Sequence, residues 1–155
     1  MPELAGSLAQ ARANGQEVTA NVYPYRAGQN NLSSIIPPWA HEGGPQKLIE
    51  RLKAPAERAK IKRDADSEID GWYNHYTAVG RDWSRMLISA NNRYQGMTMD
   101  KVIAARSAER SPAPDPIDIL LDLLVEFDGS VSTVFAHHAE EDMNLALVQP
   151  WCRSE

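Results

Sequence analysis

Strand-like segments are few in this sequence and lie far apart. Apolar and polar residues alternate in "EVTANVYPY", until Pro24, and in "SVSTVFAHHA". The segment "WSRMLISA" holds an apolar run short enough for a buried strand. Long stretches with the apolar spacing of helices separate these segments, and a hairpin joins only strands that are close in sequence. The segments therefore cannot form one sheet by hairpins, and we expect a helix-rich α/β fold with an incomplete sheet.

Prolines and glycines mark the ends of the expected helices. The segment "PELAGSLAQARANGQ" has apolar residues three and four apart and ends at Gly15, a residue suited to left-handed backbone. Ala54 and Pro55 divide the charged stretch after "PPWA" into two helices. Three further helices are expected, which begin after the N-cap Thr98, after the cap Asp115 with Pro116 at the first position, and in "EEDMNLALVQP".

The acidic charge argues against nucleic acid as a partner. Lys and Arg number 16 against 21 Asp and Glu, a formal net charge of −5, whereas binding to a phosphate backbone needs a concentrated excess of basic residues. No apolar run approaches the roughly 20 residues of a membrane helix. The single cysteine, Cys152, allows no internal disulfide, and the first residues lack the basic and apolar regions of a signal peptide. We expect a cytoplasmic protein that binds neither nucleic acid nor a membrane.

The adjacent histidines His137 and His138, in "HHAEED", are the most suggestive metal ligands because imidazole and carboxylate bind zinc well. On a strand, however, neighbouring side chains point to opposite faces, so the pair reaches one ion only if a third element brings ligands. The alternative is one packed and one solvated imidazole. Cys152 lies in a stretch expected to fray, where a nucleophile would lack a fixed base, and no serine stands in a Gly-x-Ser-x-Gly elbow. We expect no metal site and no complete catalytic set in this chain.

Tyr23, at the end of the first strand-like segment, is a candidate ligand-binding residue. In α/β enzymes the carboxyl ends of parallel strands carry the substrate contacts, and the polar stretch "RAGQNN" follows this strand end. The alternative is a ring that serves only in packing.

Three motifs occur in order along the chain: the strand end "NVYPYRAG", the segment "IPPW" and the helix start "FAHHAEED". They lie in "ANGQEVTANVYPYRAGQNNLSSIIPPWAHEGG" and "DILLDLLVEFDGSVSTVFAHHAEEDMNLALVQPW". With these motifs the sequence resembles the later portion of zinc-dependent N-acyl-D-amino-acid deacylases, also called D-aminoacylases, of the amidohydrolase superfamily. The resemblance spans nearly the whole chain.

The resemblance implies a fold. The family has a (β/α)8 barrel with a small β-domain, and a largely helical insertion between the seventh and eighth strands covers the active-site mouth. Residues 18–23 would be the seventh strand, and residues 1–37 as a whole would hold a helix, this strand and an active-site loop. Residues 38–110 would be the mainly helical insertion, and 111–155 a helix, a strand and a helix that return to the barrel. The chain would thus be a single unit and a fragment of the enzyme.

The resemblance also implies site residues. Tyr23 would contact the substrate or the reaction intermediate, and Gln29 takes the loop position where some members carry a substrate-binding serine. The family's metal ligands and catalytic aspartate have no counterpart here, since Cys152, His137 and His138 do not match their positions. The chain would belong to a hydrolase that cleaves the amide bond of N-acyl-D-amino acids with zinc-activated water. By itself it would bind no zinc and catalyse nothing.

A different class of function is a non-catalytic helical module for binding or oligomerisation. The apolar helix at 117–125 and the aromatic cluster at 72–83 motivate this alternative, because without a barrel to cover them they would expose apolar surface. Such a surface would favour self-association.

Overall fold

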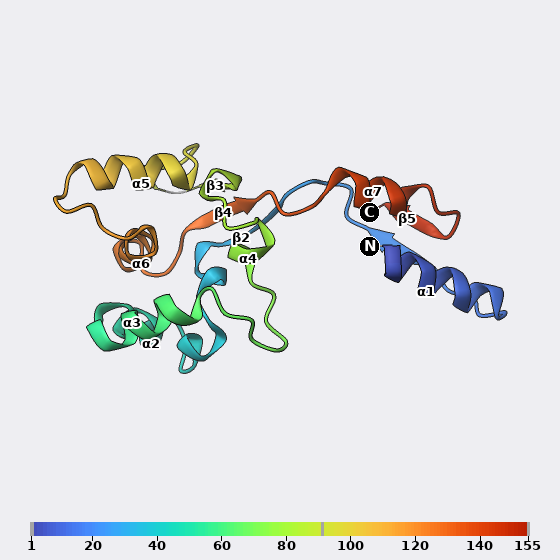
Figure 1. Cartoon of the computed structure of the whole chain (residues 1–155), viewed down its shortest axis with the longest axis horizontal. Coiled ribbons are helices and arrows are strands. Elements are labelled where there is room, and N and C mark those ends of the chain that lie inside the picture. The colour runs from blue at the N-terminus through green and yellow to red at the C-terminus, as the bar shows by residue number, and fades with distance from the viewer. Residues whose placement is uncertain (1, 91, 155) are drawn as a thin grey trace. The chain divides into compact units, whose positions relative to one another are not determined.

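The computed structural model describes residues 2–90 and 92–154, and Figure 1 shows its helices and strands. Contacts divide the chain into two compact units. Unit 1 comprises residues 2–28 and 138–154, and unit 2 comprises Gln29–His137. Within the described ranges no helix has the length and apolar character needed to cross a membrane.

Unit 1 contains two parallel strands, each preceded by a helix. Its elements are α1 (Pro2–Ala13), β1 (Ala20–Val22), α7 (Glu140–Leu147) and β5 (Cys152–Ser154). The strands pair in the register Ala20↔Cys152, Asn21↔Arg153 and Val22↔Ser154. The two predicted helices are confirmed, whereas the predicted strand 18–23 is shorter than expected. A parallel pair of this kind occurs in many α/β sheets, so the barrel inferred from the resemblance stays a prediction.

A three-stranded sheet lies in unit 2. Its strand order is β2 (Gly28–Asn31), β4 (Ser132–Phe135) and β3 (Met86–Ile88), and β3 runs antiparallel to β4. Thr133 and Phe135 of β4 are fully buried, whereas Ser132 and Val134 are half-buried. The alternation predicted for this segment is therefore confirmed.

Strand β2 was not expected, because the residues after Tyr23 have the composition of a polar loop. The segment "GQNN" has little intrinsic preference for a strand. Pairing with β4 places it in the sheet all the same, which shows that tertiary context overrides local propensity here.

Helices and short 3₁₀ turns make up much of unit 2. They are α2 (Pro45–Lys53), α3 (Pro55–Asp64), α4 (His75–Ala78), α5 (Met99–Ala108) and α6 (Pro116–Glu126), with 3₁₀ turns at Leu32–Ile35, Pro38–His41 and Trp83–Arg85. Ala54 both ends α2 and precedes α3, as predicted. The Asp115 carboxylate accepts a hydrogen bond from the Ile117 backbone N–H at 2.8 Å, which confirms the predicted cap of α6. Thr98 precedes α5 as expected but makes no side-chain capping bond.

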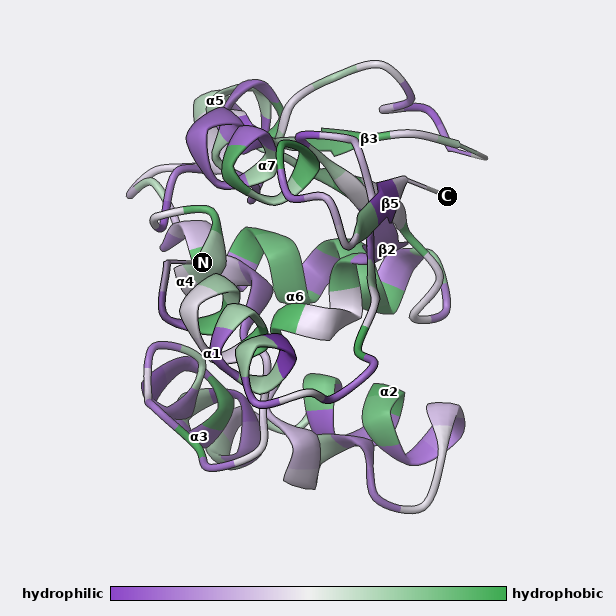
Figure 2. Cartoon of the chain, turned by 90° about the vertical axis from the view of Figure 1, so that its right-hand side faces the viewer, coloured by the Kyte–Doolittle hydropathy of each residue, from purple (hydrophilic) through white to green (hydrophobic). Residues whose placement is uncertain are grey.

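Helix α6 provides a large share of the core of unit 2, and Figure 2 shows its apolar residues in green. Five of its side chains have no exposed surface: Ile119, Leu120, Leu121, Leu123 and Leu124. The four leucines pack with residues of α2, α5 and the sheet in one cluster. The apolar stripe of this helix is therefore largely covered within unit 2.

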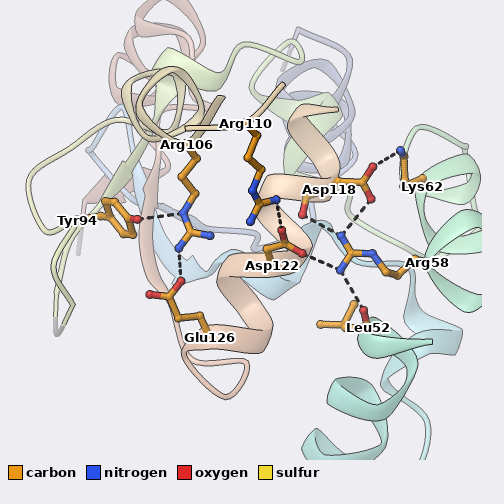
Figure 3. A network of polar contacts seen from close by, with 9 residues as sticks. All are labelled: Leu52, Arg58, Lys62, Tyr94, Arg106, Arg110, Asp118, Asp122 and Glu126. Atoms are coloured by element: carbon orange, nitrogen blue, oxygen red, sulfur yellow. Dashed lines mark hydrogen bonds and ion pairs between the residues drawn. The ribbon is translucent and has the colours of Figure 1, made fainter. Parts of the chain in front are cut away.

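Charged side chains connect α3, α5 and α6, as Figure 3 shows. Arg58 of α3 contacts Asp118 at 3.1 Å and Asp122 at 2.9 Å. One turn further along α6, the buried guanidinium of Arg106 pairs with Glu126. Burial alone would raise the pKa of Asp118, but hydrogen bonds and charge from Lys62 and Arg58 outweigh it and hold that pKa below its usual value. The network therefore favours the ionised carboxylate in the folded unit.

Candidate functional site

Tyr23 directly follows β1 and is 55% exposed. Its ring packs against that of Tyr25, with centroids 4.8 Å apart and planes tilted by 56°. Pro24 between them removes a backbone donor and ends the strand. A phenol was expected at the carboxyl end of this strand, and the structure has it there with its ring accessible to a ligand.

The chain near Tyr25 is held by residues that follow unit 2 in the sequence. His138 Nδ1 lies 2.8 Å from the Tyr25 backbone oxygen, and the His138 N–H donates to the Arg26 carbonyl at 3.1 Å. Arg26 also lies 3.6 Å from Glu140, with both side chains largely exposed. These contacts fix the backbone that carries Tyr23 and Tyr25.

Gln29 lies in β2 rather than in a loop, and it belongs to unit 2 whereas Tyr23 belongs to unit 1. Its amide nitrogen donates to Ser132 Oγ at 2.8 Å, and Ser132 Oγ lies 2.9 Å from Ser89 Oγ. A shallow depression of about 320 Å³ is lined here by uncharged polar residues: Gln29, Asn30, Asn31, Ser130 and Ser132. In the structure Gln29 thus bonds to a side chain of the neighbouring strand β4.

The adjacent histidines His137 and His138 contact different groups. His138 bonds to the backbone of unit 1, whereas His137 packs with Tyr73 and His75 of unit 2. Both follow β4, which ends at Phe135, so they are not neighbours on a strand as the sequence suggested. The expected contrast between one packed and one solvated imidazole is not found, because both side chains are half-buried.

The cluster of Tyr73, His75 and His137 was missed in the sequence. Ring centroids lie 5.1 Å apart for Tyr73 and His75, 5.9 Å for Tyr73 and His137, and 5.7 Å for His75 and His137. His75 also packs on the buried ring of Phe135 at 4.8 Å. The local signal was the density of aromatic and imidazole groups in "WYNHY", but His137 lies far along the chain and only the fold brings it near.

Asn74 positions the cluster by fixing the start of α4. Its side-chain oxygen accepts from the Tyr76 backbone N–H at 2.9 Å, and its amide nitrogen donates to the Ala65 carbonyl at 2.8 Å. Asn74 is buried, so both bonds are shielded from water. His75 therefore begins α4 directly after a residue that two side-chain hydrogen bonds hold in place.

Among the described residues, no group of three or more His, Cys, Asp or Glu side chains is arranged to hold a metal ion. Cys152 is half-buried in β5 of unit 1, whereas the cluster belongs to unit 2. No protein-family model, curated protein or solved structure matches this chain.

Proposed function

We propose that this chain belongs to a zinc-dependent amidohydrolase that removes the acyl group from N-acyl-D-amino acids, and that Tyr23 is a residue that contacts the substrate. The proposal includes a cytoplasmic location, with which the single cysteine agrees. The observation that carries it is the parallel pairing of β1 with β5, with an exposed tyrosine directly after β1.

Parallel strands support the proposal because substrate contacts in α/β barrels come from residues at the carboxyl ends of such strands. Tyr23 has this position, and α7 precedes β5 as a helix precedes the next strand in a repeating α/β unit. A phenolic hydroxyl there can donate a hydrogen bond to a carbonyl or carboxylate oxygen of the substrate.

The division of the chain also supports the proposal. Residues 29–137 have their own core and sheet and stand in the sequence between two strands that pair directly. The His138 N–H donates a hydrogen bond to the Arg26 carbonyl. This bond joins the two segments of unit 1 that precede and follow residues 29–137 in the sequence. A compact unit between two neighbouring parallel strands agrees with the largely helical insertion that the family resemblance implies, although the boundaries 29–137 differ from the 38–110 inferred from sequence.

The proposal assigns the metal chemistry to other regions of the enzyme, because the resemblance implies that the family's metal ligands and catalytic aspartate have no counterpart in this chain. What this chain contributes is substrate binding and orientation. Binding is therefore the property to test first in the chain by itself.

The test is an NMR titration of the chain with N-acetyl-D-methionine and, separately, with its L enantiomer. We expect the D enantiomer to shift the ring resonances of Tyr23 and to bind more tightly than the L enantiomer. Tyr23→Phe removes one hydroxyl donor, so its affinity for the D enantiomer should fall roughly 2- to 10-fold, the effect of about 0.5–1.5 kcal/mol for a hydrogen bond.

Tyr25→Phe is the matched control, because Tyr25 is similarly exposed at 58% and packs against the same ring. It should leave the affinity unchanged. Equal binding of the two enantiomers, or no effect of Tyr23→Phe, would refute the assignment of Tyr23. With zinc added, hydrolysis by the chain by itself should stay at background.

A further inference from the structure

Two imidazoles from distant segments of unit 2 lie side by side at its surface. His75 opens α4 and His137 follows β4, and their ring centroids are 5.7 Å apart with planes at 87°. Both residues are half-buried, and neighbouring Tyr73 is 59% exposed. The pair is therefore fixed by packing and still reached by solvent.

This separation fits two rings that share one metal ion. An imidazole nitrogen binds zinc at about 2.0–2.1 Å, so two rings on a tetrahedral ion have centroids roughly 5–6 Å apart. The centroid distance of 5.7 Å falls in this range.

Two further polar side chains contact the imidazoles. Tyr73 Oη lies 3.4 Å from His137 Nδ1, and the Asn30 amide nitrogen lies 3.4 Å from His75 Nε2. An ion that entered between these groups would gain a phenol oxygen, and rotation of the exposed Asn30 amide would free His75 Nε2. No carboxylate of the described residues joins the pair in a metal-binding group.

The buried Nδ1 of His75 has no hydrogen-bonding partner among the described residues, and its Nε2 contacts the exposed Asn30 amide. Nε2 is therefore the nitrogen of this ring that an ion would reach.

We propose that His75 and His137 form a binding site for a borderline divalent transition-metal ion, with Tyr73 and solvent completing the coordination. Nitrogen-rich sites without carboxylates favour Cu²⁺ over Ni²⁺ and Zn²⁺ and do not retain Mg²⁺ or Ca²⁺. The metal site does not depend on the hydrolase proposal.

The test is isothermal titration calorimetry of the full chain with copper, nickel, zinc and magnesium chlorides at pH 7.5 in a buffer that does not bind metals. We expect one ion per chain, affinities in the order Cu²⁺ above Ni²⁺ and Zn²⁺, and no binding of Mg²⁺. Electron paramagnetic resonance of the Cu²⁺ form should show coupling to two imidazole nitrogens.

His137→Ala should lower the Cu²⁺ affinity at least tenfold and reduce the coupling to one imidazole nitrogen. His75→Phe should do the same while it retains a ring against Phe135, and circular dichroism would verify that it is folded. The matched controls are His138→Ala and His41→Ala, because these imidazoles contact the Tyr25 and Ser33 carbonyl oxygens instead. Both controls should bind as the natural chain does.

Three results would overturn the proposal. They are no binding of Cu²⁺ by the chain, an affinity unchanged in folded His137→Ala and His75→Phe, or an affinity lost in His138→Ala. The last result would assign the ion to the adjacent pair His137 and His138 and not to the pair that the fold creates.

Discussion

The substitution Leu121→Ala tests whether α6 is the core of unit 2 or a surface for assembly. Leu121 has no exposed surface and belongs to the main apolar cluster. The deleted methyl and methylene groups carry a transfer free energy of about 0.8 kcal/mol each, and the cavity left behind adds to it. We expect the free energy of unfolding to fall by about 3 kcal/mol, within the range of buried Leu→Ala substitutions.

The matched control is Leu87→Ala, the same deletion in β3 of the same unit. Leu87 is 37% exposed and lies on the face of the sheet opposite Met86 and Ile88. Its removal leaves a site open to water and no closed cavity, so the loss should be about 1 kcal/mol. The difference between the two variants isolates the contribution of burial.

Urea unfolding followed by tryptophan fluorescence gives both values, since Trp39 and Trp83 pack against the cluster of unit 2. With a slope of about 2 kcal/mol/M, the midpoint should fall by roughly 1.5 M for Leu121→Ala and 0.5 M for Leu87→Ala. Equal shifts would refute the assignment of α6 to the core. A midpoint unchanged by Leu121→Ala, with a changed elution volume in size-exclusion chromatography, would favour the oligomerisation module.

Two further substitutions test the charge network and a backbone position. The pKa of Asp118 is lowered in the folded chain, so its contribution is present above the unfolded pKa near 4 and is lost as the pH falls through the lower folded pKa. Asp118→Asn should lower the urea midpoint at pH 7 and flatten its decline at acid pH, and an identical acid decline in both proteins would contradict this. Gly129 has φ +76°, so Gly129→Ala should lower the free energy of unfolding by about 1 kcal/mol in the same assay. Gly6→Ala is the control, since Gly6 lies in α1 with open space around it, and it should leave the stability unchanged or raise it. Equal effects of the two substitutions would show that the backbone at Gly129 is not strained.

Local chemistry determined the elements that the sequence predicted well. Pro55 separates α2 from α3, Asp115 caps α6, and the alternation along β4 sorts buried from half-buried residues. Each of these signals acts within a few residues of the chain. The structure therefore agrees with them even though their packing partners were unknown.

Pairings between distant segments could not be predicted in the same way. β2 has the composition of a loop and becomes a strand because β4 pairs with it, and β5 pairs with β1 across nearly the whole chain. The approach of His75 to His137 depends on where α4 and the end of β4 pack. A sequence pattern reports the preference of a segment, and these features arise from contacts that no single segment contains.

The two proposals lie in different units and can fail separately. Tyr23 belongs to unit 1, where its backbone is held by β1 and by the contacts of His138 with Tyr25 and Arg26. The imidazole pair belongs to unit 2, where Phe135 and Asn74 fix it. A Tyr23→Phe variant that still binds copper, and a His137→Ala variant that still distinguishes the enantiomers, would show that substrate recognition and metal binding are independent. Loss of both properties in either variant would instead mean that the units are energetically coupled, which neither set of contacts requires.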